Sequence, residues 1–389
     1  MINLFLKTEQ QKKWFKMLHE MEEKLKSRSS EIDEMARFPI ENIQDLVQMG
    51  YTSIILPQAY GGEGLKAYDM VLFQETLASF DANTALSIGW TLGVVGDIYE
   101  QKLWSDENLD FFAKEILNGA TVNRSVSEAQ TGSPSRGGRP GTSAVRKDGS
   151  WVISGRKNFT TASPSLTYFL TSAWIEEKEK VGFFLIHKDS KGLSIDETWD
   201  VIAMRGTGSH DLVLDHVVVD ESKLVELPNK SGGGFNGWVL HIPACYLGIA
   251  QAARDYAVMF ANQHSPNSLN GPISQLPNVQ QHLGEIDLEL SKARHLIYSV
   301  AEAYDDETRR EYLSNEVGIV KHAVTNAAIT IVDKAMRIVG AKSLQRSNPL
   351  QRYYRDVRAG LHNPPADDMT IRKLAETAIE QEKMKHKND

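Results

Sequence analysis

The sequence predicts a multi-domain α+β protein with a helical N-terminal part, a central β part and a helical C-terminal part. Its 389 residues are more than one hydrophobic core usually supports, so two or three domains are expected. The spacing of apolar residues also changes twice along the chain, from every third or fourth position to every second position and back again. We therefore expect domains at residues 1–118, 119–228 and 229–389.

The N-terminal domain is expected to be mostly helical. Apolar residues recur every three or four positions between Trp14 and Met21, and again between Ile43 and Val47. The glycine-rich stretch Pro57–Gly64 interrupts this pattern and is typical of a tight loop.

The central domain is expected to consist of short strands. Residues 142–147 and 150–154 flank Asp148 and Gly149, a dipeptide favoured in two-residue hairpin turns. Further strand-like runs follow at 168–174, 181–187, 212–214 and 217–219. Several short strands without helices between them predict a small antiparallel barrel or sandwich.

The C-terminal domain shows three long helical patterns, at residues 238–263, 279–304 and 314–339. Each is about 25 residues long, well above the usual mean for a helix. Long helices joined by short connections predict an antiparallel bundle.

Composition and charge exclude several classes of protein. The net charge of −8 argues against a nucleic-acid partner, because binding along phosphates requires a basic face. The single cysteine, Cys245, excludes internal disulfides, gives no basis for a multi-cysteine metal site and is expected to be a buried thiol. No apolar segment has the length of a signal peptide or a membrane span, so a cytoplasmic protein without membrane contact is expected.

Most familiar catalytic motifs are missing from the sequence. It contains no GxSxG, CxxC or HExxH motif, so a serine hydrolase or a metalloenzyme is unsupported. Gly232–Gly237 has the spacing of a dinucleotide-binding loop, but a polar linker precedes it instead of a strand. We interpret it as a loop that leads into the next helix.

Five sequence blocks, in order along nearly the whole chain, resemble the acyl-CoA dehydrogenase family of flavoenzymes. The blocks are Leu56–Gly62 (LPQAYGG), Ser125–Ser133 (SVSEAQTGS), Gly155–Ala162 (GRKNFTTA), Met204–Asp211 (MRGTGSHD), and Val339–Ala341 followed by Tyr354–Asp356 (VGA and YRD). The resemblance implies an N-terminal helical domain, a central antiparallel β-barrel, a C-terminal four-helix bundle and assembly into a homotetramer.

The resemblance also assigns residues to a flavin and a substrate. Val126 and Ser127 would address the polar edge of the isoalloxazine ring, Phe159 would form an aromatic wall and Thr161 would donate towards flavin N5. Ser133 matches the serine that meets the phosphate or pantetheine arm of acyl-CoA.

The segment that reaches the adenine end of the cofactor departs from the family pattern. Gln263–Gly271 carries neither the arginine nor the phenylalanine of the family's Arg-x-x-Phe-Gly segment. Arg337 stands in place of a glutamine, whereas Gly340 and Ala341 nearly keep the glycine site. FAD is therefore the expected cofactor, with FMN as the alternative.

The catalytic base of the family is also missing. Pro364 occupies the usual position of the glutamate, and the alternative position on an earlier helix aligns near Trp238. Candidate replacements are His362, His241, Asp367 and Asp368, although the two aspartates could instead cap a helix that begins near Met369. Trp238 and His241 are also candidate substrate-binding residues.

A histidine near the tail is typical of a second group with this fold. The pattern Arg355-x-x-Arg358-x-x-x-His362 resembles flavin-dependent monooxygenases in which a histidine lies beside the reactive flavin. A histidine can exchange protons near neutral pH.

The family resemblance thus implies a flavin-dependent oxidoreductase that oxidises an acyl-CoA between its α and β carbons, with hydride transfer to flavin N5. One alternative is a two-component monooxygenase that uses reduced flavin and O2 on a small organosulfur, amine or aromatic compound. Another is a non-catalytic protein that binds flavin or acyl-CoA. The expected redox partner is an electron-transfer flavoprotein or a flavin reductase.

Overall fold

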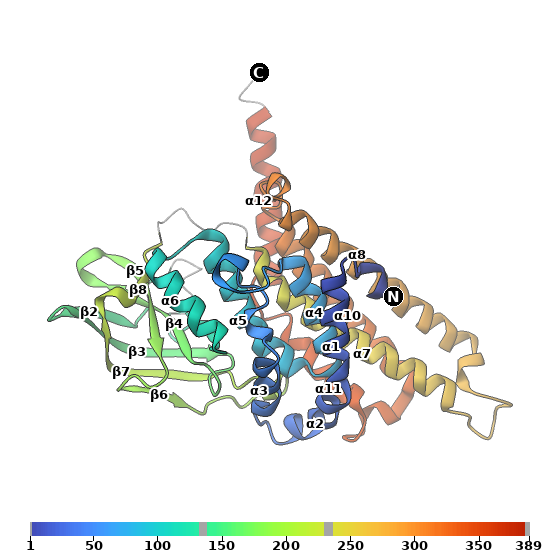
Figure 1. Cartoon of the computed structure of the whole chain (residues 1–389). Helices are drawn as coiled ribbons and strands as arrows, with labels where there is room; N and C mark the ends of the chain where they lie inside the picture. Colours follow the sequence, from blue (N-terminus) through green and yellow to red (C-terminus); the bar gives the residue numbers. More distant parts are fainter. Residues whose placement is uncertain (1, 132–137, 229–235, 386–389) are drawn as a thin grey trace.

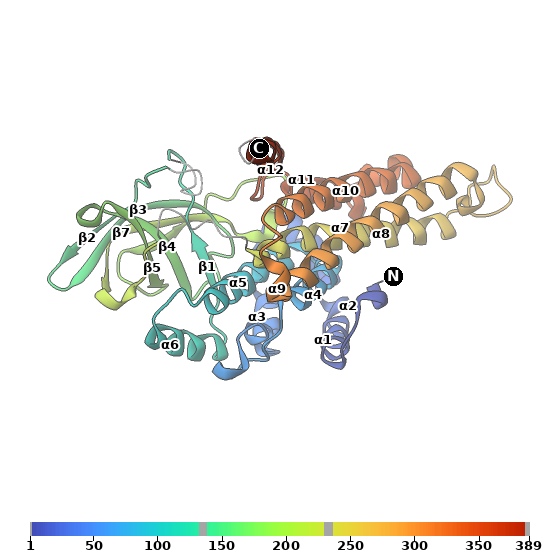
Figure 2. The same ribbon diagram turned by 90° about the horizontal axis from the view of Figure 1, so that it is seen from above.

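The computed structural model describes residues 2–131, 138–228 and 236–385. A β-sheet forms one end of the molecule and long helices form the other, with N-terminal helices packed between and beside them (Figures 1 and 2). The predicted fold class, three parts in the order helical, β and helical, is confirmed. No helix among these residues has the length and apolar character needed to cross a bilayer.

The N-terminal part contains six α-helices. They are α1 (Glu9–Glu20), α2 (Glu22–Glu34), α3 (Ile40–Gln48), α4 (Ala67–Phe80), α5 (Ala82–Gln101) and α6 (Asp106–Leu117). Helix α1 begins where Thr8 and Gln11 form a reciprocal capping box, and α5 begins where the Asp81 carboxylate accepts from the backbone N–H of Thr84. Helices α4 and α5 are buried along most of their length because their sequences are apolar on nearly every face.

The central part is an eight-stranded sheet. Its strands are β1 (Val122–Ser125), β2 (Ser143–Lys147), β3 (Ser150–Thr160), β4 (Tyr168–Ile175), β5 (Lys180–His187), β6 (Leu193–Asp196), β7 (His210–Asp220) and β8 (Leu224–Glu226). Seven strands follow the order β6-β7-β3-β2-β4-β5-β8, and β1 pairs with β4. The predicted hairpin turn is present between β2 and β3, where Asp148 and Gly149 have φ values of 50° and 75°.

Two details of the sheet differ from the sequence-based expectation. The pairs β1–β4 and β2–β4 are parallel, so the sheet is mixed. Parallel partners require crossover connections, and the segments between β1, β2 and β4 provide them. The two expected strands at 212–214 and 217–219 form the single strand β7, with His216 in a left-handed conformation at φ 52°.

The C-terminal part is built from the predicted long helices. It contains α7 (His241–Gln263), α8 (Pro277–Asp305), α9 (Glu307–Arg310), α10 (Glu316–Val339), α11 (Pro349–Ala359) and α12 (Asp367–Lys385). Helices α7, α8 and α10 pack together, and α4 joins them through a buried ion pair between Glu75 and Arg294. Cys245 of α7 is buried, as expected, and burial raises the pKa of its thiol.

Two adjacent residues of α11 fix the segment before β7 to the helices. The Asp356 carboxylate accepts a 2.6 Å hydrogen bond from the backbone N–H of Met204. The Arg355 guanidinium donates to the carbonyl of Ile202 at 2.6 Å and forms an ion pair with Asp33 of α2. The Arg-Asp pair therefore positions the edge of the β part against two helices that are distant in sequence.

Candidate functional site

A buried ion pair organises the loop that follows β1. Lys157 of β3 is fully buried, and its Nζ donates to a Glu128 oxygen at 2.6 Å and to the Ser172 hydroxyl at 3.1 Å. Burial opposes ionisation of Glu128, but donors from Lys157, Thr142 and Thr131 outweigh it and lower the pKa of this carboxyl to about 2. Glu128 also accepts from the backbone N–H groups of Gly141 and Thr142, so one carboxylate fixes both ends of the loop between β1 and β2.

This ion pair holds the predicted ring-binding residues at the same end of the sheet. The backbone N–H of Asn158 donates to the Ser127 carbonyl at 2.9 Å, which joins β3 to the segment of Val126 and Ser127. Both of these residues are partly exposed. The structure thus brings two separate sequence blocks together at one place.

Phe159 and Thr161 complete this end of the sheet. Phe159 has a left-handed φ of 56°, and 63% of its surface is exposed, with only the edge of the Trp199 ring nearby at 6.1 Å. The Thr161 hydroxyl lies 2.9 Å from the Ser209 hydroxyl, which in turn lies 2.9 Å from that of Thr207. A chain of three hydroxyls therefore stands beside an exposed aromatic ring.

The residues at this end of the sheet fit an isoalloxazine ring. Phe159 offers a flat apolar surface, whose exposure in an unusual backbone conformation has no explanation in core packing. Two buried polar atoms nearby in sequence, Asn158 Oδ1 and Ser125 Oγ, have no hydrogen-bond partner within the chain. Polar atoms and a flat wall are what a bound flavin requires of its protein.

Ser209 and Asn123 were not identified from the sequence. The Asn123 amide donates to the Thr161 carbonyl at 3.0 Å and thereby fixes the backbone of the proposed N5 donor. Ser209 belongs to the Met204–Asp211 block, so the motif indicated its place, but only the structure shows its contact with Thr161.

Trp238 and His241 fill the space beside a glycine-lined face of α5. A Cβ at Gly96 would lie 2.2 Å from the Trp238 ring, and a Cβ at Gly89 would lie 2.9 Å from the His241 ring. Trp238 Nε1 donates to Glu100 at 3.0 Å. Because α5 also bonds to β1 through Thr91 and Val122 (Figure 2), these two buried side chains lie on the helical side of the sheet.

The environment of His241 fixes its tautomer. Its Nδ1 lies 2.9 Å from the Trp238 carbonyl, which can only accept, so Nδ1 carries the proton. Burial lowers the pKa of His241 to about 4, and the hydrogen bond to the Trp238 carbonyl opposes this only in part. The imidazole is therefore neutral at physiological pH, with a buried Nε2 lone pair that has no partner among the described residues.

The C-terminal candidates differ in their surroundings. Asp367 begins α12 and accepts from Lys321 at 3.1 Å and from Asn326 at 2.9 Å. Burial opposes ionisation of Asp367, but these donors outweigh it and lower its pKa. Asp368, His362 and Pro364 are exposed, and Asn363 accepts a 2.5 Å hydrogen bond from the buried Tyr246 hydroxyl.

The residues predicted for the adenine end of a dinucleotide lie elsewhere. Arg337 pairs with Asp333 on the surface of α10, and Gly340 has φ 69° with open space where a Cβ would stand. Lys342 lies over Phe260, near the end of α7 opposite to His241. At 1.5 Å per residue this places Arg337, Gly340 and Ala341 roughly 30 Å from His241.

Two sequence-based assignments fall on residues outside the described ranges. Ser133 is one of them, and the Gly232–Gly237 loop lies there except for its last two residues. Within the described ranges, no group of three or more His, Cys, Asp or Glu side chains is arranged to hold a metal ion.

Comparisons with known proteins agree with the arrangement of domains. Models of the N-terminal, middle and C-terminal domains of acyl-CoA dehydrogenases match residues 6–118, 124–217 and 234–361. A protein of Bacillus subtilis (strain 168) named "Putative acyl-CoA dehydrogenase YdbM" is 59% identical over 97% of this chain and 100% of its own length.

Two solved structures show the same fold. Butyryl-CoA dehydrogenase from Megasphaera elsdenii superposes with a TM-score of 0.85 at 20% identity, covering 96% of this chain and 99% of its own. TdsC from Paenibacillus sp. A11-2, in a complex with FMN and indole, has a TM-score of 0.85 at 21% identity, covering 95% and 97%. The chain, which holds the family's flavin-ring residues at one end of its sheet, belongs to the acyl-CoA dehydrogenase family of flavoproteins.

Proposed function

We propose that this flavoprotein is a two-component monooxygenase, which uses reduced flavin from a separate reductase and O2 to oxygenate a small molecule. The observation that carries the proposal is the environment of the C-terminal tail. Pro364 stands where dehydrogenases of the family carry their base, and the nearby Asp367 is occupied by Lys321 and Asn326.

Dehydrogenation of an acyl-CoA requires a basic carboxylate above the substrate α carbon. A carboxylate becomes a strong base when it is desolvated and unpaired. Asp367 has the opposite surroundings, because its hydrogen bonds and its ion pair stabilise the charged form and lower its pKa. Asp368 is exposed to solvent, so neither aspartate has the environment of such a base.

The helical wall favours a compact substrate over a long acyl chain. By resemblance, Trp238 lies where some dehydrogenases carry their alternative base, next to the substrate. Here Trp238 and His241 are buried and packed against the glycine face of α5. His241 is also a poor base, since burial lowers its pKa to about 4.

The remaining residues have definable roles in a monooxygenase. Phe159 would cover one face of the flavin ring, and Thr161, oriented by Ser209, would donate a hydrogen bond to its edge. When bound, the reduced flavin supplies two electrons for the activation of O2, the substrate supplies two more, one oxygen atom goes to the substrate and the other becomes water. His362 is exposed beside this tail, and an imidazole suits proton exchange near neutral pH.

The relatives support both this proposal and a second one. The titles of structural neighbours name complexes of TdsC with FMN and indole, and of KijD3 with FMN and a dTDP-linked amino sugar. The 59% identical relative carries the name of an acyl-CoA dehydrogenase, which favours dehydrogenation as the second candidate. The flavin is FMN in the first case and FAD in the second.

One pair of absorbance experiments separates the two candidates. The flavin-loaded protein is titrated without oxygen against acyl-CoAs of several chain lengths, and then reduced flavin and protein are mixed with O2. We expect no bleaching by any acyl-CoA, and a transient species, distinct from oxidised and reduced flavin, after mixing with O2. Bleaching by an acyl-CoA would refute the monooxygenase proposal and establish dehydrogenation.

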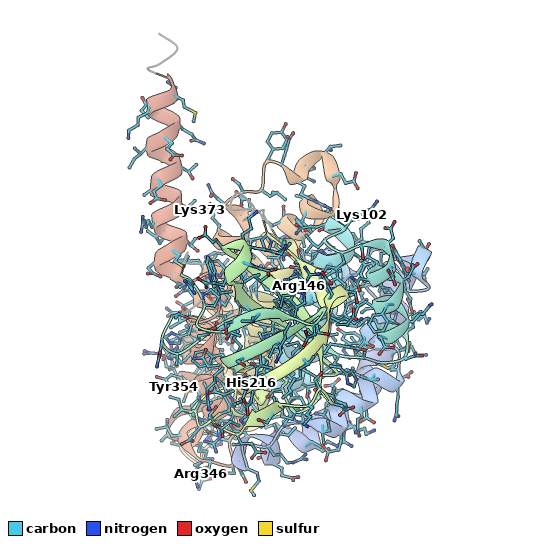
Figure 3. All side chains as sticks on the ribbon, turned by 90° about the vertical axis from the view of Figure 1, so that its left-hand side faces the viewer. Lys102, Arg146, His216, Arg346, Tyr354 and Lys373 are labelled. Atoms are coloured by element: carbon cyan, nitrogen blue, oxygen red, sulfur yellow. The ribbon has the colours of Figure 1, made fainter. Side chains whose placement is uncertain are left out.

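A substitution then tests the tail. His362→Ala should lower the rate of substrate oxygenation by about 100-fold, the usual contribution of a general acid or base. His216→Ala is the matched control, because His216 is an exposed histidine on the sheet (Figure 3) and should leave the rate unchanged. Equal rates for both variants would remove His362 from the proposed mechanism.

A further inference from the structure

Helix α12 extends away from the rest of the molecule. Figures 1 and 3 show it projecting as a single rod beyond the bundle, with side chains on all sides. Of its 19 residues only Thr370 is buried. At 1.5 Å per residue the helix is roughly 28 Å long.

One narrow face of α12 contacts the chain's own bundle. Thr370 lies beside Gly318 of α10, Lys373 Nζ donates to the Ser314 carbonyl at 2.8 Å, and the Thr377 hydroxyl accepts from Asn315 at 3.3 Å. These contacts are polar and lie in the first half of the helix.

A different face carries an apolar stripe. Its members follow the spacing i, i+3, i+4, i+7 and i+8 of an amphipathic helix, and they are Ile371, Leu374, Ala375, Ala378 and Ile379. Ile371 is 54% exposed and Ile379 is 55% exposed. At 3.6 residues per turn, the stripe is rotated by roughly 130° from the face that contacts the bundle. The bundle therefore does not cover it.

An isolated helix with such a stripe is unfavourable in water. Helices of this length owe most of their stability to the packing of an amphipathic face, and a row of exposed large apolar residues marks an interaction surface. The stripe therefore requires a partner with a matching apolar face.

We propose that α12 pairs in antiparallel orientation with α12 of a second copy of this chain, around a two-fold axis near Ala375. In such an isologous contact each residue meets its counterpart across the axis. The small Ala375 and Ala378 allow the two helices to approach closely at the centre. Ile371 of one chain then packs against Ile379 of the other on both sides of the axis.

The charges of α12 favour this partner over others. The first turn is acidic at Asp367 and Asp368, and the last turn is basic at Lys383 and Lys385. Antiparallel pairing brings these opposite charges together, whereas parallel pairing would join like charges. A membrane is disfavoured as the partner, because the polar face also carries Glu376, Glu380 and Glu382 instead of being uniformly basic.

Disulfide trapping tests the pairing in the full-length protein. Ala375→Cys places a thiol at the proposed axis, and the native Cys245 is buried and gives little background. Glu380→Cys is the matched control, since Glu380 is equally exposed but lies on the opposite face. Under mild oxidation we expect at least tenfold more cross-linked dimer for Ala375→Cys than for Glu380→Cys. Equal yields, or no dimer from Ala375→Cys, would overturn the proposal.

A second set of variants tests the stripe itself. Ile371→Asp combined with Ile379→Asp should abolish the Ala375→Cys cross-link, whereas Glu376→Ala combined with Glu380→Ala should preserve it. Because α12 lies outside the body, flavin absorbance should show that all variants remain folded. A cross-link that survives the aspartates would overturn the proposal. So would flotation with anionic vesicles that the aspartates abolish, which would identify a membrane as the partner.

Discussion

At the scale of single residues, Glu128 has the largest number of structural contacts near the proposed flavin ring. It joins β3, the end of β1 and the segment before β2 through one carboxylate. The family motif indicated a glutamate in this loop but not its partner, because Lys157 is 29 residues away. The residue that positions the loop is therefore distinct from those proposed to touch the flavin.

Glu128→Ala should destabilise the protein by about 3–5 kcal/mol, because it leaves the Lys157 ammonium buried without a counter-charge. The free energy of unfolding in urea provides the measurement. Glu221→Ala removes the exposed ion pair with Arg146 and serves as the control, with an expected loss below about 1 kcal/mol. Similar losses in the two variants would show that burial of the Glu128 pair has no special cost.

Asp356 should make stability depend on pH. Burial raises the pKa of its carboxyl to about 7, above the value of about 4 in an unfolded chain. Between these values the folded state holds a proton that the unfolded state has lost. Stability attributable to this group is therefore full below pH 4 and falls as pH rises towards 7, by about 1.4 kcal/mol per pH unit.

Asp356→Asn should remove this slope, because the amide does not titrate. Unfolding free energies of both proteins, measured between pH 4 and 7, give the comparison. The difference between wild type and variant should shift in favour of the variant as pH rises. A constant difference across the window would contradict a raised pKa.

At the scale of elements, α5 shows how small residues decide what packs beside a helix. Gly89, Gly93 and Gly96 leave a shallow face into which His241 and Trp238 fit. The helical period predicted α5 and the helix that follows Trp238, but the match between these faces depends on their orientation in space.

Gly96→Ala should destabilise the protein by about 1–3 kcal/mol, because the new Cβ would lie 2.2 Å from the Trp238 ring. Gly284→Ala is the matched control in another helix, where no atom lies within 4 Å of the added Cβ. It should stabilise by about 0.5–1 kcal/mol, since alanine favours helix more than glycine. Urea midpoints of the two variants should therefore move in opposite directions.

At the scale of the whole molecule, the residues assigned to the cofactor fall into two groups. Val126, Ser127, Phe159 and Thr161 lie at the sheet, whereas Arg337, Gly340 and Ala341 lie near the far end of α7, roughly 30 Å from His241. One chain thus does not present both groups to one small cofactor. If Arg337 meets an adenine, it does so on the cofactor of another copy.

Arg337→Glu should weaken FAD binding by about tenfold and leave FMN binding unchanged, because FMN has no adenine. Equilibrium titrations followed by flavin fluorescence measure both affinities. Arg309→Glu, at an exposed position on α9, controls for the change in net charge. Unchanged FAD affinity would show that Arg337 does not contact the dinucleotide.

The sequence alone determined the order of the three parts, the long helices, the Asp148-Gly149 hairpin and the family, because short windows encode periodicity, turn chemistry and motifs. Only the tertiary structure decided which residues meet. Arg355 pairs with Asp33 across 322 positions, Glu128 pairs with Lys157, and the Trp238 carbonyl fixes the tautomer of His241. These contacts depend on how elements pack, and the free energies that select them come from burial and charge pairing between distant segments, which no local pattern contains.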